Sequence, residues 1–174
     1  MQHDPGTTSS SSSSRRPPVE PLKVLVVCSG NICRSPMAEQ VLRRAFAQAG
    51  FDGRVTVASA GTGDWHVGQG AAEPARRVLA GAGYPTDHIA QQVTTRLVDD
   101  AALVLAADRG HYATLRRMAA DPSTVHLLRT FDPDADGDEV PDPYGSPDPA
   151  YREVLAMLEA AAPGIVDAVA ARLT

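Results

Sequence analysis

The chain has 174 residues, enough for one compact domain and too few for two ordinary ones. Its formal net charge of -5 argues against general nucleic-acid binding, which needs a basic face. Two cysteines are too few for a secreted disulfide scaffold, and no apolar run approaches the roughly 20 residues that cross a bilayer. We therefore expect a cytoplasmic protein without nucleic-acid or membrane partners, either monomeric or weakly self-associating.

Residues 1–21 are expected to form a disordered tail, because their serine run and Arg15-Arg16-Pro17-Pro18 bury too little apolar area to offset the entropy of ordering. The folded domain is expected over residues 22–174. Strands are predicted at 24–27, 55–58, 102–106 and 125–128, where apolar runs suit buried strands. Helices are predicted between Pro36 and Gly50, then at 72–80 and 110–119.

A last helix is predicted from about Pro147, capped by Ser146 and kinked or split at Pro163-Gly164. Strands that alternate with helices in this way imply a parallel sheet with helices on both faces. In such α/β folds, ligands bind beyond the carboxyl ends of the strands, close to helix N-termini.

One loop at such a place carries chemistry: Cys28-Ser29-Gly30-Asn31-Ile32-Cys33-Arg34-Ser35. It lies between the first strand and the first helix, where backbone N–H groups and the helix dipole form a cradle for a tetrahedral dianion. Gly30 is expected to let the backbone turn tightly, and Asn31 tolerates left-handed dihedrals. Arg34 can bind two phosphate oxygens with its planar fork.

The same cradle favours the thiolate of Cys28, and Ser35 is placed to donate a hydrogen bond to the sulfur. A thiolate there can attack phosphorus and form a phosphocysteine intermediate. The leaving oxygen then needs a proton, and the best candidate donor is Asp142, in a segment stiffened by Pro141 and Pro143.

The cysteine loop (residues 28–35) followed by Pro36, and the late Asp142-Pro143-Tyr144, resemble the signatures of the low-molecular-weight protein tyrosine phosphatase family. The resemblance spans about residue 23 to the C-terminus. It implies a four-stranded parallel sheet in a flavodoxin-like, three-layer α/β fold. It also implies hydrolysis of phosphotyrosine in proteins, with neither a cofactor nor a metal.

The resemblance also assigns roles to residues. Cys28 is the nucleophile, Arg34 the phosphate clamp, Ser35 the thiolate partner, Asn31 a loop organiser and Asp142 the general acid and base. Trp65 and Tyr144 would flank a phenyl ring. Cys33 matches a second loop cysteine that can form a reversible disulfide with the nucleophile, although simple packing in the core is an equal alternative. The phosphate-binding loop would be completed by Ser29, Gly30 and Ile32.

Two other functions fit the cysteine loop. The first is an arsenate reductase on the same fold, although the thioredoxin-coupled type needs further cysteines and this chain has none beyond Cys33. The second is a non-catalytic phosphate-binding module, which would be expected to lose the nucleophile or the acid. The acidic stretch that begins at Asp132 starts like a calcium loop, but its twelfth residue is Pro143 rather than the required Glu. His66 and His88 are given no role.

Overall fold

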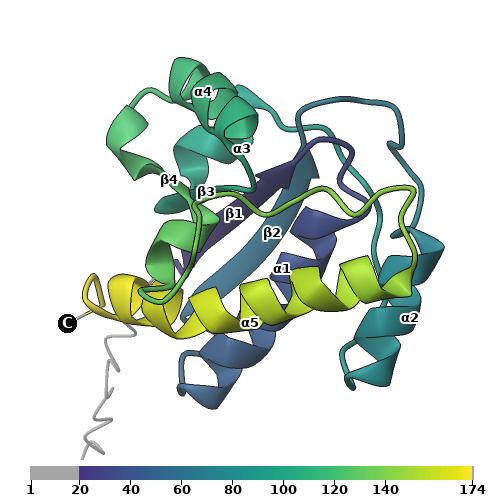
Figure 1. Ribbon diagram of the computed structural model, residues 1–174. Helices are drawn as coiled ribbons and strands as arrows, with labels where there is room; N and C mark the ends of the chain where they lie inside the picture. The colour runs from purple at the N-terminus through teal and green to yellow at the C-terminus, as the bar shows by residue number, and fades with distance from the viewer. Residues whose placement is uncertain (1–19, 174) are drawn as a thin grey trace, which may run out of the picture.

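The computed structural model describes residues 20–173, which form a central sheet between two layers of helices (Figure 1). The strands are β1 (Leu22–Cys28), β2 (Val55–Gly61), β3 (Leu103–Ala106) and β4 (Val125–Leu127). Their order is β2-β1-β3-β4, and every neighbouring pair is parallel. The predicted four-stranded parallel sheet is therefore confirmed.

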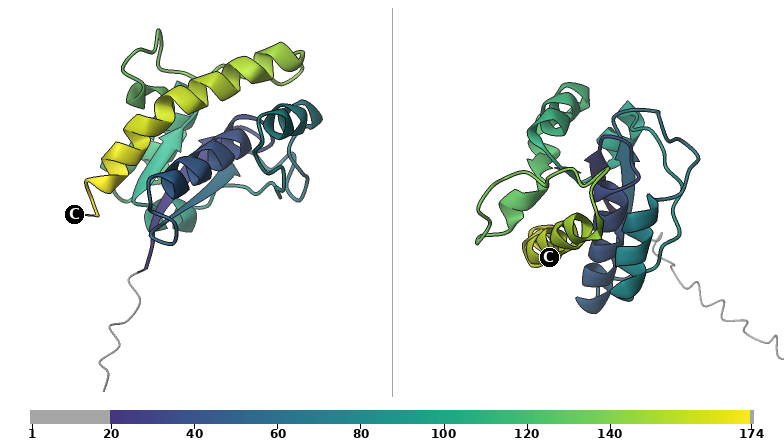
Figure 2. Two further views of the ribbon diagram at one scale, coloured as in Figure 1. Left: turned by 90° about the horizontal axis from the view of Figure 1, so that it is seen from below. Right: turned by 45° about the vertical axis from the view of Figure 1, so that its right-hand side comes forward.

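The two faces of the sheet carry different helices. One face packs against α1 (Arg34–Gln48), α2 (Glu73–Gly81) and α5 (Asp148–Ala170), and the other against α3 (Thr95–Asp100) and α4 (Arg109–Met118). Alternate residues of β1 separate the two cores: Val24 and Val26 belong to the first, Leu25 and Val27 to the second. Figure 2 shows α1 and α5 side by side on the first face.

The short helix α3 was not predicted from the sequence. Thr94 caps it by accepting a hydrogen bond from the Leu97 N–H, and it buries a single side chain, Val98. A six-residue helix with one buried position has too short a periodic pattern to be recognised. Two short 3₁₀ helices, η1 (Pro122–Thr124) and η2 (Leu128–Phe131), flank β4.

The prediction that the last helix is split at Pro163-Gly164 is wrong, because α5 runs without interruption from Asp148 to Ala170. Ala162 and Ile165, on either side of the pair, are buried in the core, and this packing offsets the backbone hydrogen bond that Pro163 cannot donate. The predicted cap is also wrong. Pro147 occupies the N-cap position in place of Ser146, and no side chain caps the helix.

Backbone hydrogen bonds gather three loops at the carboxyl edge of the sheet. Thr62 N–H donates to the carbonyl of Cys28, Ala107 N–H to that of Val27, and Val140 N–H to that of Ala107. The segments after β1, β2 and β3, and the loop that leads into α5, are thereby fixed at one edge. Among the described residues, no helix is both long enough and apolar enough to span a membrane.

Candidate active site

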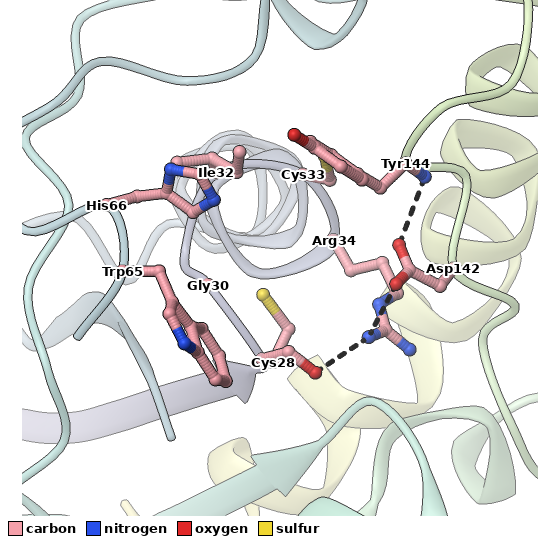
Figure 3. A pocket seen from close by; sticks show the side chains of 10 residues that line it. Cys28, Gly30, Ile32, Cys33, Arg34, Trp65, His66, Asp142 and Tyr144 are labelled. Carbon is pink, nitrogen blue, oxygen red and sulfur yellow. Dashed lines mark hydrogen bonds and ion pairs between the residues drawn. The ribbon is translucent and has the colours of Figure 1, made fainter. Parts of the chain in front are cut away.

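Cys28 is the last residue of β1, and its thiol lines a cavity of about 160 Å³ at the carboxyl edge of the sheet (Figure 3). Its Sγ lies 2.9 Å from Ser35 Oγ. Asn31 Nδ2 donates to the same hydroxyl at 2.8 Å, so the Ser35 proton is left to face either the sulfur or the carbonyl of Ala60, 3.4 Å away. A sulfur that receives this proton is better stabilised as an anion.

Asn31 holds the turn of the cysteine loop. It is the one described residue other than glycine with a positive φ, 58°. Its Oδ1 accepts the Gln91 N–H at 2.9 Å, and its carbonyl accepts from His88 Nε2 at 2.6 Å. Its Nδ2 also donates to Ser59 at 3.0 Å. A fully buried side chain with this many partners fixes a backbone conformation that L-residues rarely adopt.

Gly30 has a different part from the one expected. Its φ is not positive, so the turn does not depend on the dihedral freedom of a glycine at this position. A Cβ at Gly30 would lie only 2.8 Å from Cδ2 of His66. The glycine therefore makes room for the imidazole of His66, which lines the cavity although no sequence pattern singled it out.

The loop leads into α1 with its backbone donors uncovered. The N-cap residue of α1, Cys33, makes no side-chain hydrogen bond to the first turn. The N–H groups of that turn and the positive end of the helix dipole are then available to an anion in the cavity. Within residues 20–173, no group of three or more His, Cys, Asp or Glu side chains is placed to hold a metal ion.

Arg34 is buried and fixed by two acceptors. Its Nη1 donates to Asp108 Oδ2 at 3.0 Å and to the carbonyl of Val140 at 3.0 Å, which leaves other donors of the guanidinium for a ligand. Burial alone would raise the pKa of Asp108. The hydrogen bond from the His111 backbone and the influence of His111 and Arg34 outweigh burial and lower that pKa. Asp108 therefore remains the anion that pairs with Arg34.

Asp142 stands on the opposite wall of the cavity, in the acid loop (residues 141–147) that connects Val140 to α5. Its Oδ2 is 3.8 Å from Nη2 of Arg34, and its Oδ1 accepts the Tyr144 N–H at 3.1 Å. The carboxyl group is half exposed and can therefore meet a ligand that enters from solvent.

Trp65 and Tyr144 form the rim of the cavity, on opposite sides of the cysteine in Figure 3. They are 68% and 63% exposed, unusually high values for large aromatic side chains. The His66 and Tyr144 ring centroids lie 6.2 Å apart. An aromatic ring of a ligand can therefore be held between flat side chains above the thiol.

Cys33 is buried, and its sulfur lies 3.5 Å from the hydroxyl of Tyr151 in α5. Burial raises the pKa of Cys33 to about 11, so this cysteine is a neutral thiol at physiological pH. Cys28 and Cys33 are both free. The reversible disulfide between them stays a prediction.

Besides His66, sequence reasoning missed two further residues that contact the cysteine loop. Asp108 and His111 lie at the start of α4, where each caps the other: the Asp108 carboxylate accepts the His111 N–H, and His111 Nδ1 accepts the Asp108 N–H. Asp108 comes two residues after a buried strand, and the rule that ligands bind at strand carboxyl ends could have identified it. No comparable pattern marks His111.

A cysteine at the carboxyl end of a strand, facing a helix N-terminus, an arginine in the loop that follows and a carboxylic acid across the cavity define the class of phosphatases that use a cysteine nucleophile. Residues 23–173 match the family model of the low molecular weight phosphotyrosine protein phosphatases. The chain belongs to this family. Cys28 and Arg34 occupy the positions expected for its phosphate-binding loop.

Two curated relatives and one solved structure place the chain within the family. The low molecular weight protein-tyrosine phosphatase A of Mycobacterium tuberculosis is 46% identical over 157 residues, covering 88% of this chain and 95% of the relative. The corresponding phosphatase of Streptomyces coelicolor is 47% identical over 152 residues, covering 84% and 93%. The crystal structure of YfkJ from Bacillus subtilis has a TM-score of 0.84 at 32% identity, covering 91% of this chain and all of that one (100%).

Proposed function

We propose that this protein hydrolyses phosphotyrosine in proteins, with Cys28 as nucleophile, Arg34 as phosphate clamp and Asp142 as general acid and base. One observation carries the proposal: Cys28, Arg34 and Asp142 line one cavity, although they come from β1, α1 and the acid loop. Each supplies a different requirement of the reaction, and the two aromatic residues of the rim add a preference for an aryl ester.

In the first step, the Cys28 thiolate attacks phosphorus opposite the leaving oxygen. The S–P bond forms as the P–O bond to the tyrosine breaks, and Asp142 donates its proton to the departing phenolate oxygen. The N–H groups of the cysteine loop and the free donors of Arg34 bind the equatorial oxygens, where negative charge is spread in the transition state.

In the second step, a water molecule attacks the phosphocysteine. Asp142, now a carboxylate, takes a proton from that water, the S–P bond breaks, and inorganic phosphate leaves with Cys28 again a thiolate. The distance of 2.9 Å between Cys28 Sγ and Ser35 Oγ supports the sulfur as a leaving group, because the hydroxyl can donate to the charge that develops on it.

The rim supports tyrosine rather than serine or threonine as the phosphorylated side chain. A phosphate bound in the cysteine loop must be reached through the opening between Trp65 and Tyr144. A phenyl ring is long and flat enough to place its phosphate at Cys28 while it stacks on these residues, whereas a short aliphatic ester would lose those contacts.

An arsenate reductase needs a second thiol that can receive the disulfide and pass it outward. Cys33 is the chain's only other cysteine, it is buried, and its raised pKa of about 11 keeps it protonated. These properties favour the phosphatase. A cytoplasmic location and a monomeric or weakly associated state stay predictions from the sequence.

The experiment compares wild type, Cys28→Ser and Asp142→Asn on 4-nitrophenyl phosphate and on phenyl phosphate, in excess chelator. Cys28→Ser should abolish turnover of both. Asp142→Asn should slow phenyl phosphate by ~10²- to 10⁴-fold and the 4-nitrophenyl ester much less, since a good leaving group needs little protonation. Asp100→Asn, in an exposed ion pair on α3, is the matched control. Turnover by Cys28→Ser at the wild-type rate would refute the nucleophile.

A further inference from the structure

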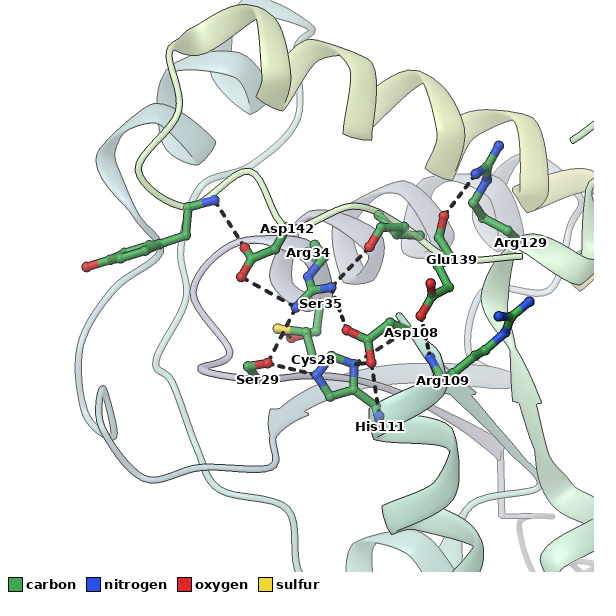
Figure 4. A network of polar contacts seen from close by, with 12 residues as sticks. Cys28, Ser29, Arg34, Ser35, Asp108, Arg109, His111, Arg129, Glu139 and Asp142 are labelled. Atoms are coloured by element: carbon green, nitrogen blue, oxygen red, sulfur yellow. Dashed lines mark hydrogen bonds and ion pairs between the residues drawn. The ribbon is translucent and has the colours of Figure 1, made fainter. Parts of the chain in front are cut away.

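His111 is a buried histidine whose proton can be located from its partners. Its Nδ1 accepts the backbone N–H of Asp108 at 3.3 Å, while Asp108 Oδ1, 3.1 Å from Nδ1, accepts the His111 backbone N–H; we therefore assign no proton to Nδ1. Burial lowers the pKa of this imidazole and outweighs the opposite effect of the Asp108 carboxylate, which keeps the ring neutral at physiological pH. In this tautomer the ring proton is on Nε2, which lies 2.8 Å from Ser29 Oγ and donates to it (Figure 4).

Ser29 therefore receives two hydrogen bonds on its oxygen. One comes from Nε2 of His111 and the other from Nη2 of Arg34, at 3.4 Å. A hydroxyl has two acceptor sites and one proton of its own. Neither donor can accept that proton, because the guanidinium has no acceptor and Nε2 is already protonated. The hydroxyl proton must be directed elsewhere.

The remaining direction is the cavity. Ser29 lines it together with Cys28 and Arg34, and in Figure 4 its hydroxyl lies between the Arg34 guanidinium and the imidazole of His111. An anion held over Cys28 by the loop N–H groups and by Arg34 would find this hydroxyl beside it. The most basic acceptors then available to the serine proton are the oxygens of that anion.

We propose that Ser29 is a further phosphate-binding side chain and that His111 is its positioning residue, because the two donors to the Ser29 oxygen turn its hydroxyl proton toward the substrate's phosphate. The inference rests on the proposed function, in that it takes the cavity to bind a phosphate monoester. Ser29 would join the backbone N–H groups and Arg34 as a donor to the phosphate. The buried imidazole of His111 would then have a role beyond capping α4.

Four variants separate these contacts. Ser29→Ala removes the hydroxyl and Ser29→Thr keeps it. His111→Asn keeps an acceptor for the Asp108 N–H but is too short to reach Ser29, whereas His111→Gln can extend an amide N–H to Ser29. Each is compared with wild type for the inhibition constant of inorganic phosphate and for kcat and KM on 4-nitrophenyl phosphate. His126→Asn, in β4 and outside the cavity, is the matched control.

Ser29→Ala should weaken phosphate binding about tenfold, since hydrogen bonds to charged groups are worth that much or more. Ser29→Thr should bind phosphate within about twofold of wild type. His111→Asn should match the loss in Ser29→Ala, the double variant should be no weaker than either single variant, and His111→Gln should recover most of the affinity.

Wild-type phosphate affinity in Ser29→Ala would overturn the proposal. Additive losses in the double variant would also overturn it, because His111 would then act without Ser29. Thermal unfolding of each variant identifies any loss that comes from the fold alone, and Ser29→Ala, at a half-buried position, tests the contact without disturbing the cap of α4. Phosphate affinity is measured without turnover, so its result is independent of whether Cys28→Ser abolishes hydrolysis.

Discussion

Arg34 and Asp108 form a partly buried ion pair across the active-site edge of the sheet, with Nη1 of the arginine 3.0 Å from Oδ2 of the aspartate. They are 74 residues apart in sequence, at the N-termini of α1 and α4 on opposite faces of the sheet. The pair orients the guanidinium before a ligand arrives, so binding a phosphate does not require the side chain to be ordered.

Asp108→Asn should therefore lower kcat/KM, although Asp108 need not touch the substrate. The amide can keep one hydrogen bond to Arg34 but loses the charge that holds the fork in place. We expect kcat/KM for 4-nitrophenyl phosphate to fall by about 10- to 100-fold, the range for a hydrogen bond between charged groups. Steady-state kinetics measures this, and Asp100→Asn should remain within about twofold of wild type. Equal rates in both variants would contradict a role for the pair.

Alkylation should distinguish the two cysteines. Both cysteines are buried and line the cavity, but burial raises the pKa of Cys33 to about 11, whereas the sulfur of Cys28 lies 2.9 Å from the Ser35 hydroxyl. Because the thiolate is the reactive form, iodoacetamide at pH 7.5 should label Cys28 and leave Cys33 unmodified in the folded protein. Peptide mass spectrometry after a short exposure reads out both sites, with urea-unfolded protein as the control in which both are labelled. Early labelling at Cys33 would be inconsistent with the buried thiol.

The lowered pKa of His111 predicts a loss of stability on mild acidification. As the pH falls below about 6.5, the unfolded chain takes up a proton at this histidine before the folded protein does, so the free energy of unfolding decreases. The loss attributable to one such group is at most about 1.4 kcal/mol per pH unit. Asp108, Arg34, Asp142 and Glu139 are the charged groups that surround the imidazole.

Urea unfolding of wild type and His111→Asn at pH 7.5, 6.5 and 5.5 measures this effect. Glu39, whose pKa is raised by burial, acts in the opposite direction, because the folded state holds its proton more tightly and gains stability as the pH falls. Glu39 is common to both proteins, so the difference between them isolates His111. Wild type should lose more stability than the variant between pH 7.5 and 5.5, and parallel losses would contradict the assignment.

Gly164 in α5 lies against η2, and a Cβ there would be 2.1 Å from the carbonyl oxygen of Phe131. A backbone atom cannot move aside as a flexible side chain can, so Gly164→Ala should lower the free energy of unfolding by about 1–3 kcal/mol. Gly81→Ala, in α2 with no atom within 4 Å of the added carbon, is the control and should be neutral or stabilising by up to about 1 kcal/mol. Chemical denaturation measures the free energy of unfolding of both variants, and equal values would show that η2 moves freely.

The sheet was predictable because its strands are short continuous apolar runs, and their alternation with helices leaves few arrangements. The helix break predicted at Pro163 is absent because of tertiary packing. Residues on both sides of the proline pack into the core, which local sequence rules do not take into account. The cap expected at Ser146 failed because Pro147 already has the extended backbone that an N-cap position requires.

The cysteine loop was predictable because its residues are adjacent in sequence and each has a chemical reason for its place. The residues that hold it in shape come from elsewhere. Asp108 and His111 begin α4, Ser59 lies in β2, and the carbonyl that binds Arg34 belongs to Val140. Contacts between segments so far apart in the chain leave no spacing pattern in a single sequence. Every residue has a backbone carbonyl, so the residue type does not show which carbonyl binds a side chain.

Val140 is buried, donates its N–H to Ala107 and offers its carbonyl to Arg34, so the acid loop begins at a residue that already belongs to the phosphate site. Its other end is the first turn of α5, where Asp148 pairs with Arg77 of α2. Of the seven residues between them, Asp142 and Tyr144 line the cavity, whereas Ser146 does not. Substituting Ser146, or lengthening the segment there, can change which phosphoproteins gain access while both anchor points and the chemistry beneath them stay the same.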